Sequence, residues 1–247
     1  VLLAVMAGMY TVYHGKEGIT KIANKINYLT RLLSNGLNLL DFEQENEVFF
    51  DTLKIKVDEK VKLKIKNSAE DKRINLRYFE SNHIGISIDE TKSINDIFDL
   101  INIFSEFSDK KLEIDLNALG NIDSNTKNKE SRSSDFLSHE IFNKYHTEHE
   151  ILRYMKRLEN KDLSLVHSMI SLGSCTMKLN ATTEMIPVTW DKMNIHPFVP
   201  EDQALGYKEM IDTLNSWLSE ITGFSSLSFQ PNSGAQGEYT GLMVIRA

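Results

Sequence analysis

Residues 231–236, Pro-Asn-Ser-Gly-Ala-Gln, place a hydroxyl and a flexible glycine where an apolar segment gives way to a helical pattern. A strand over 225–230, followed by this turn and a helix, would direct backbone N–H groups and the positive end of the helix dipole at one place, which favours a phosphate. Asn232 or Ser233 can cap the helix, and Gly234 lets the backbone approach a ligand closely. An ordinary strand-to-helix connection explains the pattern equally well, and the Gly-Lys-Ser/Thr element of a P-loop is missing.

A second polar loop, over 172–180, reads Leu-Gly-Ser-Cys-Thr-Met-Lys-Leu-Asn. It combines a thiol, two hydroxyls, an amine and an amide, as a small-molecule site requires, although a solvated connector fits the same residues. Cys175 as a covalent nucleophile would need a neighbouring base, and the spacing of His167 makes it a poor candidate. We therefore expect no cysteine catalysis.

The histidines give weaker indications. His139, His146 and His149 have no companion cysteine or carboxylate at metal-ligand spacing, so we expect no metal site. His196, in the sequence His-Pro-Phe, is either a loop-packing residue or a site residue, and the sequence alone leaves both open.

The N-terminal elements that must position these residues follow from apolar spacing. A buried helix over 1–13 closes at Gly15, and an amphipathic helix covers 16–35. A β-α-β-β-α pattern then predicts a small α+β unit with mostly antiparallel pairing, whose last helix starts with a capping-box pair, Ser93 and Asp96. Its five elements span 47–57, 58–70, 74–80, 84–89 and 93–107.

The C-terminal part is more irregular. Residues 117–135 are polar and predict a linker or a long surface loop. A cap signal at Thr147 opens the next helix, and 167–202 is mostly loop. An amphipathic helix over 203–222 ends at Gly223, and the helix after the 231–236 turn follows.

Composition restricts the class of protein. The 247 residues suffice for one large or two small domains, and 41% hydrophobic with 26% charged residues is typical of a globular chain. A formal charge of −7 disfavours a general nucleic-acid-binding surface. The single cysteine, Cys175, excludes an intrachain disulfide and fits a reducing compartment, and no apolar run reaches membrane-span length.

The two ends of the sequence look like interrupted elements. The apolar start, Val1 to Met9, lacks a basic n-region and an initiator methionine, so a buried helix explains it better than a signal peptide. The other end, Ala247, falls inside a helical pattern, and we expect a chain cut at both ends. The bias toward Lys, Ile and Asn indicates an AT-rich genome and a bacterial cytoplasm, with a mitochondrial matrix as the alternative.

Taken together, these segments resemble the P-protein family of the glycine cleavage system, the decarboxylating glycine dehydrogenases that use pyridoxal phosphate. The resemblance covers nearly the whole chain and is poorest over 108–130. It is carried by Leu-Arg-Tyr-Met-Lys-Arg-Leu at 152–158, the loop 172–180, and segments 184–190, 196–198 and 230–239. N-terminal segments match as well, at 10–15, 75–79 and 83–91.

The resemblance implies an α/β fold class, aminotransferase-like (pyridoxal-phosphate fold type I), here incomplete and with an α+β small domain. The family has two homologous halves, of which the second holds the cofactor. Residues 1–35 would end the large domain of the N-terminal half and 36–120 would form its small domain. Residues 121–146 would be a linker, and 147–247 the beginning of the cofactor-binding half.

The resemblance also implies roles for individual residues. The cofactor phosphate would be bound by Ser233, Gly234 and Ala235. Substrate-binding contacts at the site entrance would come from Thr176, Lys178, Asn180 and His196. The Schiff-base lysine would lie beyond residue 247, so no catalytic residue is expected in this chain. Two departures from the family pattern are Ser171 in place of proline and a 190–196 loop one residue shorter.

The activity that the resemblance implies is decarboxylation of glycine with transfer of the aminomethyl group to the lipoyl arm of H-protein. Its partners would be glycine and lipoylated H-protein, with a homodimer of the full-length chain and neither nucleic acid nor membrane. Two alternatives stay open: another fold type I lyase or decarboxylase, and a non-catalytic subunit that only binds a partner. A lipoyl requirement for exchange of the glycine carboxyl carbon would argue against the first alternative. A His-Lys pair at the end of a later strand, beyond Ala247, would argue against the second.

Overall fold

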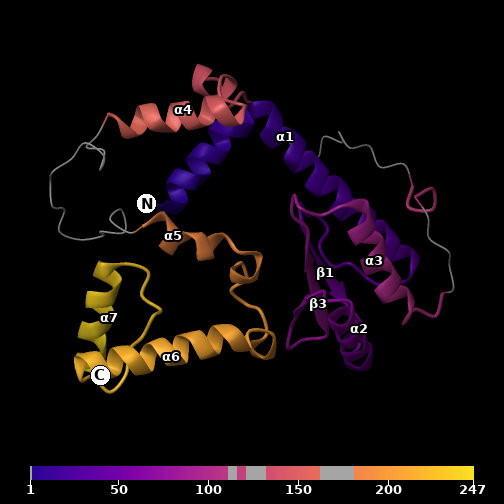
Figure 1. Cartoon of the computed structure of the whole chain (residues 1–247). Helices are drawn as coiled ribbons and strands as arrows, with labels where there is room; N and C mark the ends of the chain where they lie inside the picture. Colours follow the sequence, from indigo (N-terminus) through magenta and orange to yellow (C-terminus); the bar gives the residue numbers. More distant parts are fainter. Residues whose placement is uncertain (1, 111–115, 121–131, 162–180) are drawn as a thin grey trace. The chain divides into compact units, whose positions relative to one another are not determined.

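The computed structural model describes residues 2–110, 116–120, 132–161 and 181–247 (Figure 1). The chain divides into two compact units, Val1–Leu172 and Gly173–Ala247, each of which is considered by itself. Among the described helices, none combines the length and the apolar character needed to cross a membrane.

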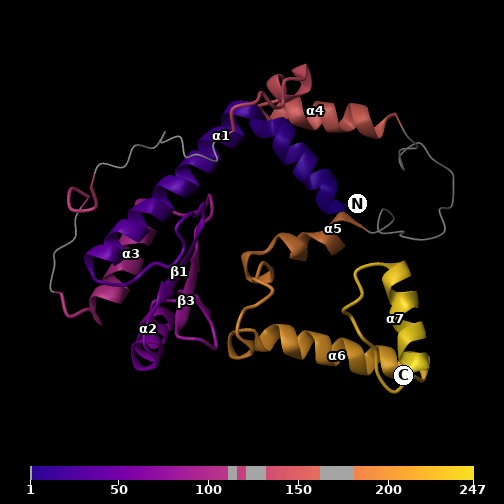
Figure 2. The same ribbon diagram turned by 180° about the vertical axis from the view of Figure 1, so that it is seen from behind.

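The first unit begins with α1, Leu2–Leu39, which is broken at Gly15. Gly15 has φ 61° and ψ −172°, a backbone conformation that is essentially restricted to glycine. The predicted division into two helices at this residue is confirmed, and the second part continues past residue 35 to Leu39. Figures 1 and 2 both show α1 bent.

A three-stranded antiparallel sheet follows, in the order β1-β3-β2. Its strands are β1 Thr52–Lys56, β2 Arg77–Tyr78 and β3 His83–Ser87. Leu53 pairs with Ile86 and Ile55 with Ile84, so these four apolar side chains share one buried face. The opposite face is polar, as the period of two requires for a half-covered sheet.

Two capped helices complete this α+β unit, α2 Glu59–Asp71 and α3 Ile94–Ser105. Asp58 caps α2 by accepting from the N–H groups of Lys60 and Val61, at 2.9 and 3.1 Å. The predicted Ser93–Asp96 capping box at α3 is confirmed. Both helices and the second part of α1 pack on the apolar sheet face in one core, whose fully buried members include Leu33, Leu53, Ile65, Ile84 and Phe104.

The predicted β-α-β-β-α order is confirmed, but all three strands are shorter than predicted, the third by one residue, at His83–Ser87 instead of 84–89. The first covers Thr52–Lys56 instead of 47–57, and the second Arg77–Tyr78 instead of 74–80. Every residue of β1 pairs with one of the five residues of β3. Strand length is therefore set by the partner, which the alternation within one segment cannot reveal.

The remaining described part of the first unit contacts α1. Its helices are η1 Glu140–Asn143 and α4 Glu148–Glu159, and the predicted Thr147–Glu150 cap of α4 is confirmed. The carbonyl of Tyr13 lies 2.7 Å from Nδ1 of His146, and Lys16 forms an ion pair with Asp135. Residues of the segment predicted as a linker thus contact α1 at its break.

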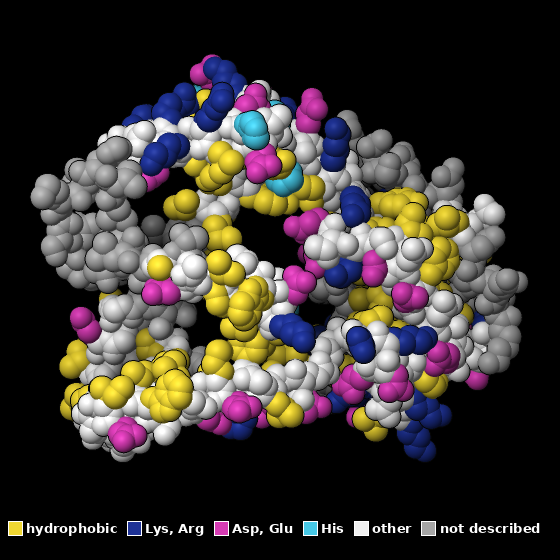
Figure 3. All heavy atoms as spheres, in the orientation of Figure 1, with side chains coloured by type: hydrophobic (Ala, Val, Ile, Leu, Met, Phe, Trp, Pro, Cys, Tyr) yellow, Lys and Arg dark blue, Asp and Glu magenta, His cyan; other side chains and the backbone are white. Residues whose placement is uncertain are grey.

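The regular elements in the described part of the second unit are all helices, joined by loops. Its elements are α5 Thr182–Met185, η3 Ile186–Thr189, η4 Asp191–Met193, η5 Glu201–Gln203, α6 Leu205–Thr222 and α7 Gly234–Arg246. The predicted end of α6 at Gly223 is confirmed, and Gly223 has the left-handed conformation, at φ 78°. No residue of α6 or α7 is buried, and Figure 3 shows hydrophobic side chains in yellow over both helices.

The strand predicted over 225–230 is not formed, and this prediction was wrong for the described chain. A strand needs a neighbour to pair its N–H and C=O groups. Here the Leu227 N–H instead donates to Oδ1 of Asn215, on α6, at 2.8 Å. The segment that leads to the candidate phosphate site is therefore tied to α6 by a side chain.

Candidate functional site

Two side chains stabilise the turn before α7, and each accepts a hydrogen bond from a backbone N–H group of the turn or of the first helical residues. Ser233 is the N-cap, and its Oγ accepts from the N–H of Gln236 at 3.3 Å. The side-chain carbonyl of Gln236 accepts from the N–H of Asn232 at 2.8 Å. Of the two candidate caps, the structure selects Ser233. The role of Gln236 was missed, although the Ser-x-x-Gln spacing is that of a capping box.

This turn leaves backbone donors free at the positive end of a 13-residue helix. Within the part of the chain that the structure describes, the N–H groups of Gly234 and Ala235 have no hydrogen-bond partner. A Cβ placed on Gly234 would meet no heavy atom within 4 Å, so the space beside this glycine is open. Two free N–H groups, a hydroxyl and the helix dipole are what a phosphate requires, and the residues present fit one.

His196 lies on an exposed loop between η4 and η5. Its Nδ1 accepts from the N–H of Phe198 at 3.1 Å, and its carbonyl accepts from the N–H of Val199 at 3.0 Å. Its ring lies 5.9 Å from that of Phe198. These described contacts are local, and none joins His196 to the turn before α7.

The other predicted substrate-binding residues, Thr176, Lys178 and Asn180, lie outside the described residues, as do Cys175 and His167.

Two of the three histidines considered above for a metal site make structural contacts. His139 caps η1 by accepting from the N–H of Ile141 at 3.2 Å, and His146 contacts the Tyr13 carbonyl. The described residues contain no group of three or more His, Cys, Asp or Glu side chains that could hold a metal ion.

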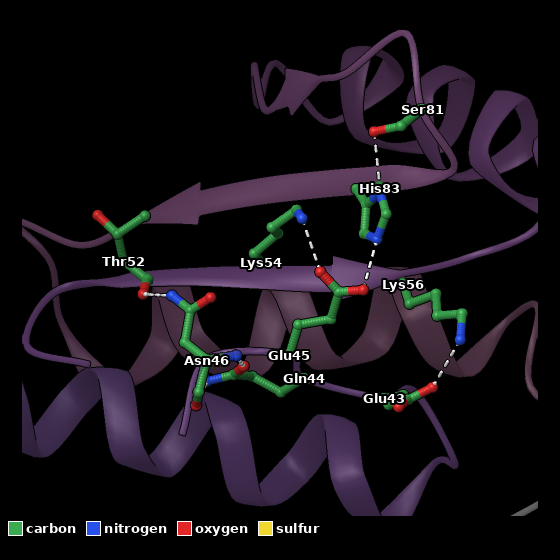
Figure 4. A network of polar contacts seen from close by, with 9 residues as sticks. All are labelled: Glu43, Gln44, Glu45, Asn46, Thr52, Lys54, Lys56, Ser81 and His83. Atoms are coloured by element: carbon green, nitrogen blue, oxygen red, sulfur yellow. Dashed lines mark hydrogen bonds and ion pairs between the residues drawn. The ribbon is translucent and has the colours of Figure 1, made fainter. Parts of the chain in front are cut away.

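A second polar cluster joins a serine, a histidine and a carboxylate on the polar face of the sheet (Figure 4). Ser81 Oγ lies 2.9 Å from Nδ1 of His83, whose Nε2 lies 2.8 Å from Oε1 of Glu45. Lys54 forms an ion pair with the other oxygen of Glu45 at 2.6 Å. These residue types also form nucleophilic triads, which need a substrate cleft beside the hydroxyl. The cavity on α2 and β2 is lined by neither Ser81 nor His83 nor Glu45.

The cluster instead fixes the segment before β1 to the sheet. The Glu45 N–H donates to the Lys54 carbonyl at 2.9 Å, and the Lys56 N–H donates to the Glu43 carbonyl at 2.9 Å. The Lys54 hydrogen bond, and after it that of His83, lowers the pKa of the Glu45 carboxyl below its ordinary value. We interpret the cluster as structural.

This interpretation predicts a pH-dependent effect of Glu45→Gln. Because the folded-state pKa is lowered, the contribution of Glu45 to stability is present above the unfolded-state pKa of about 4.3 and is lost as pH falls through the folded-state pKa. The variant should unfold at lower urea concentration than the wild type at pH 6, and the difference should shrink toward pH 3. Glu47→Gln is the control, since Glu47 forms no ion pair in the described chain. An equal difference at both pH values would contradict the interpretation.

Comparisons with known proteins agree with the resemblance. The family model described as "Glycine cleavage system P-protein" matches residues 1–104. Three relatives align with the whole chain: a "Glycine dehydrogenase (decarboxylating)" of Nostoc sp., 50% identical, one of Christiangramia forsetii, 51% identical, and the mitochondrial one of Homo sapiens, 48% identical. The alignment covers 25%, 26% and 24% of their respective lengths. The chain thus spans about a quarter of the length of the curated relatives it matches.

The matches are not confined to one motif. The three alignments span the whole chain, and so they include the sheet, the break in α1 and the turn before α7. The family model independently covers α1 and most of the α+β unit. On this evidence the chain is similar, over its whole length, to part of the P-protein of the glycine cleavage system.

Proposed function

We propose that this chain is part of a pyridoxal-phosphate-dependent glycine dehydrogenase (decarboxylating). The full protein would decarboxylate glycine and transfer the aminomethyl group to the lipoyl arm of H-protein. The observation that carries the proposal is the group of free donors at the start of α7. It is supported by relatives that are about half identical over the whole chain and are named for this activity.

Three consecutive residues would bind the cofactor phosphate. The N–H groups of Gly234 and Ala235 would donate to phosphate oxygens, because the described chain offers them no other acceptor. The Ser233 hydroxyl can donate its hydrogen to a third oxygen while a lone pair of Oγ still accepts from the N–H of Gln236. When bound, pyridoxal phosphate supplies an electron sink for the carbanion left by loss of CO2. The part of this chain in that chemistry is to fix the phosphate end.

The domain boundaries remain part of the proposal. The α+β unit of α2, α3 and the sheet would be the small domain, 36–120, of an aminotransferase-like half of fold type I. Residues 1–35 would end the large domain before it. Residues 121–146 would link this half to the cofactor-binding half, which would begin with 147–247.

The polar loop would bind glycine or the lipoyl arm, through Thr176, Lys178 and Asn180, with His196 in the same region. Lys178→Ala in the full-length protein should raise the apparent KM for glycine or for H-protein, while the cofactor absorption spectrum stays normal. An ammonium there can meet the glycine carboxylate or attract an acidic partner. Steady-state kinetics with each substrate varied in turn would test this, and unchanged KM and kcat for both would make Lys178 an ordinary surface residue.

The decisive test of the function is exchange of the glycine carboxyl carbon with labelled CO2. The full-length protein loaded with pyridoxal phosphate should catalyse this exchange, and lipoylated H-protein should stimulate it strongly. Exchange without any lipoyl requirement would favour another fold type I lyase or decarboxylase. Binding of H-protein without exchange would favour a non-catalytic subunit. Light scattering on the same sample would test the proposed homodimer.

We propose a bacterial cytoplasm as the compartment. Relatives from bacteria support it, whereas mitochondrial relatives keep the matrix as the alternative.

A further inference from the structure

A cavity of about 390 Å³ lies between η1 and α4 in the first unit, apart from the turn before α7. Two stacked tyrosine rings, Tyr145 and Tyr154, line it, with centroids 4.4 Å apart and planes 15° apart. Tyr154 is only 8% exposed, so this aromatic pair is anchored in the unit. One side of the cavity is therefore formed by an ordered pair of aromatic rings, against which other side chains can pack.

The guanidinium of Arg157 packs against the two tyrosine rings. Its guanidinium lies 5.2 Å from the Tyr154 ring centroid and 5.7 Å from that of Tyr145, and Nη2 donates to the Tyr145 hydroxyl at 2.6 Å. No carboxylate of the described chain pairs with Arg157. A guanidinium carries five N–H donors in a planar fork, so several remain for a ligand. Since the rings already order the side chain, a ligand would lose less binding energy to immobilising it.

Other charged side chains make the lining of the cavity more positive. Lys161 follows Arg157 by four residues, also lines the cavity, and forms no ion pair with the described chain. Lys144 lines it too but is paired with Glu140, at 2.7 Å. The lining thus carries an excess of two positive charges, with His139 neutral, in a chain whose formal charge is −7. Figure 3 shows Lys and Arg side chains in dark blue gathered over α4.

We propose that this cavity binds the oxyanion of a small molecule, a phosphate or a carboxylate, through Arg157 and Lys161. The guanidinium fork matches two oxygens of either group, and the ammonium adds a second charge. The proposal concerns a site separate from the cofactor phosphate turn. It does not depend on the proposed enzymatic activity.

The test uses the full-length protein loaded with pyridoxal phosphate, so that the turn before α7 is already filled. Inorganic phosphate and succinate are titrated separately by calorimetry, which tells a phosphate site from a carboxylate site. We expect one of the two to bind, with affinity falling as NaCl is added. Arg157→Gln and Lys161→Gln should each weaken it at least tenfold. Arg153→Gln removes the same charge from α4 outside the cavity and should leave the affinity unchanged.

Several outcomes would overturn the proposal. They are absence of binding by either anion, equal weakening by Arg153→Gln, and an effect of the cavity variants on H-protein affinity alone, which would make the surface a protein-docking site. Lys161→Gln decides the result if Arg157→Gln fails to fold, because Arg157 and not Lys161 is the cation placed over the two tyrosine rings in the described chain. Ser233→Ala should not change anion binding here, so failure of this proposal is distinct from failure of the cofactor proposal.

Discussion

Gly15→Ala is expected to lower the free energy of unfolding of the first unit by about 4 kcal/mol, the sum of backbone strain and overpacking. The backbone at Gly15, with φ 61° and ψ −172°, is strained for any residue with a Cβ. An added Cβ would also lie 2.3 Å from the Phe142 carbonyl oxygen and 2.8 Å from Cε1 of His146. The first of these atoms is backbone, so the contact can be relieved only by moving η1 away from α1.

The control lies in the same helix. Gly8 has an ordinary helical backbone, and an added Cβ there would meet nothing within 4 Å. Gly8→Ala should therefore leave stability unchanged or raise it by up to about 1 kcal/mol through helix propensity. Urea unfolding followed by circular dichroism, with both variants in the same protein, measures the difference. Similar midpoints for the two variants would show that the break in α1 is not a required feature.

The contrast between these two glycines shows what the sequence could and could not predict. A helix end at Gly15 follows from local pattern, and so do the caps at Ser93 and Thr147, because the interacting groups are within four residues of one another. The contact of Gly15 with Phe142 joins segments more than a hundred residues apart. Gly36 is a similar case, since an added Cβ would lie 2.4 Å from Cδ1 of Ile101. Neither spacing nor composition carries such information.

The candidate site also has features that local sequence predicts and features that depend on distant segments. The cap and the free donors at the start of α7 follow from residues 231–236 alone, and the structure places them as local chemistry requires. The strand predicted at 225–230 fails because its pairing depends on a partner strand, which the described chain does not supply. The described contacts of His196 are all local. The position of a loop residue depends on the segments that pack against it, and local sequence does not reveal these. A role for it beyond these contacts rests on the family resemblance.

Gly234→Val in the full-length protein is expected to weaken pyridoxal phosphate binding at least about 100-fold, which corresponds to about 2.7 kcal/mol. The described space around Gly234 is open, so the valine itself should fit and the variant should fold. Its branched side chain would occupy the place where a phosphate meets the N–H groups of Gly234 and Ala235. Loss of affinity without loss of stability is therefore the signature of a ligand site, as opposed to a packing site.

Two variants calibrate this result. Ser233→Ala removes one hydroxyl and should weaken cofactor binding by about 1–3 kcal/mol, the range of a hydrogen bond to a charged group, together with about 1 kcal/mol of helix stability from the lost cap. Gly241→Val makes the same steric change two turns further along α7, where an added Cβ also meets nothing within 4 Å. It should keep the cofactor, because no free N–H group lies beside it. Spectroscopic titration with pyridoxal phosphate measures all three variants. If Gly234→Val binds the cofactor as tightly as Gly241→Val does, the start of α7 does not hold the phosphate, and the role proposed for this chain in cofactor binding fails with it.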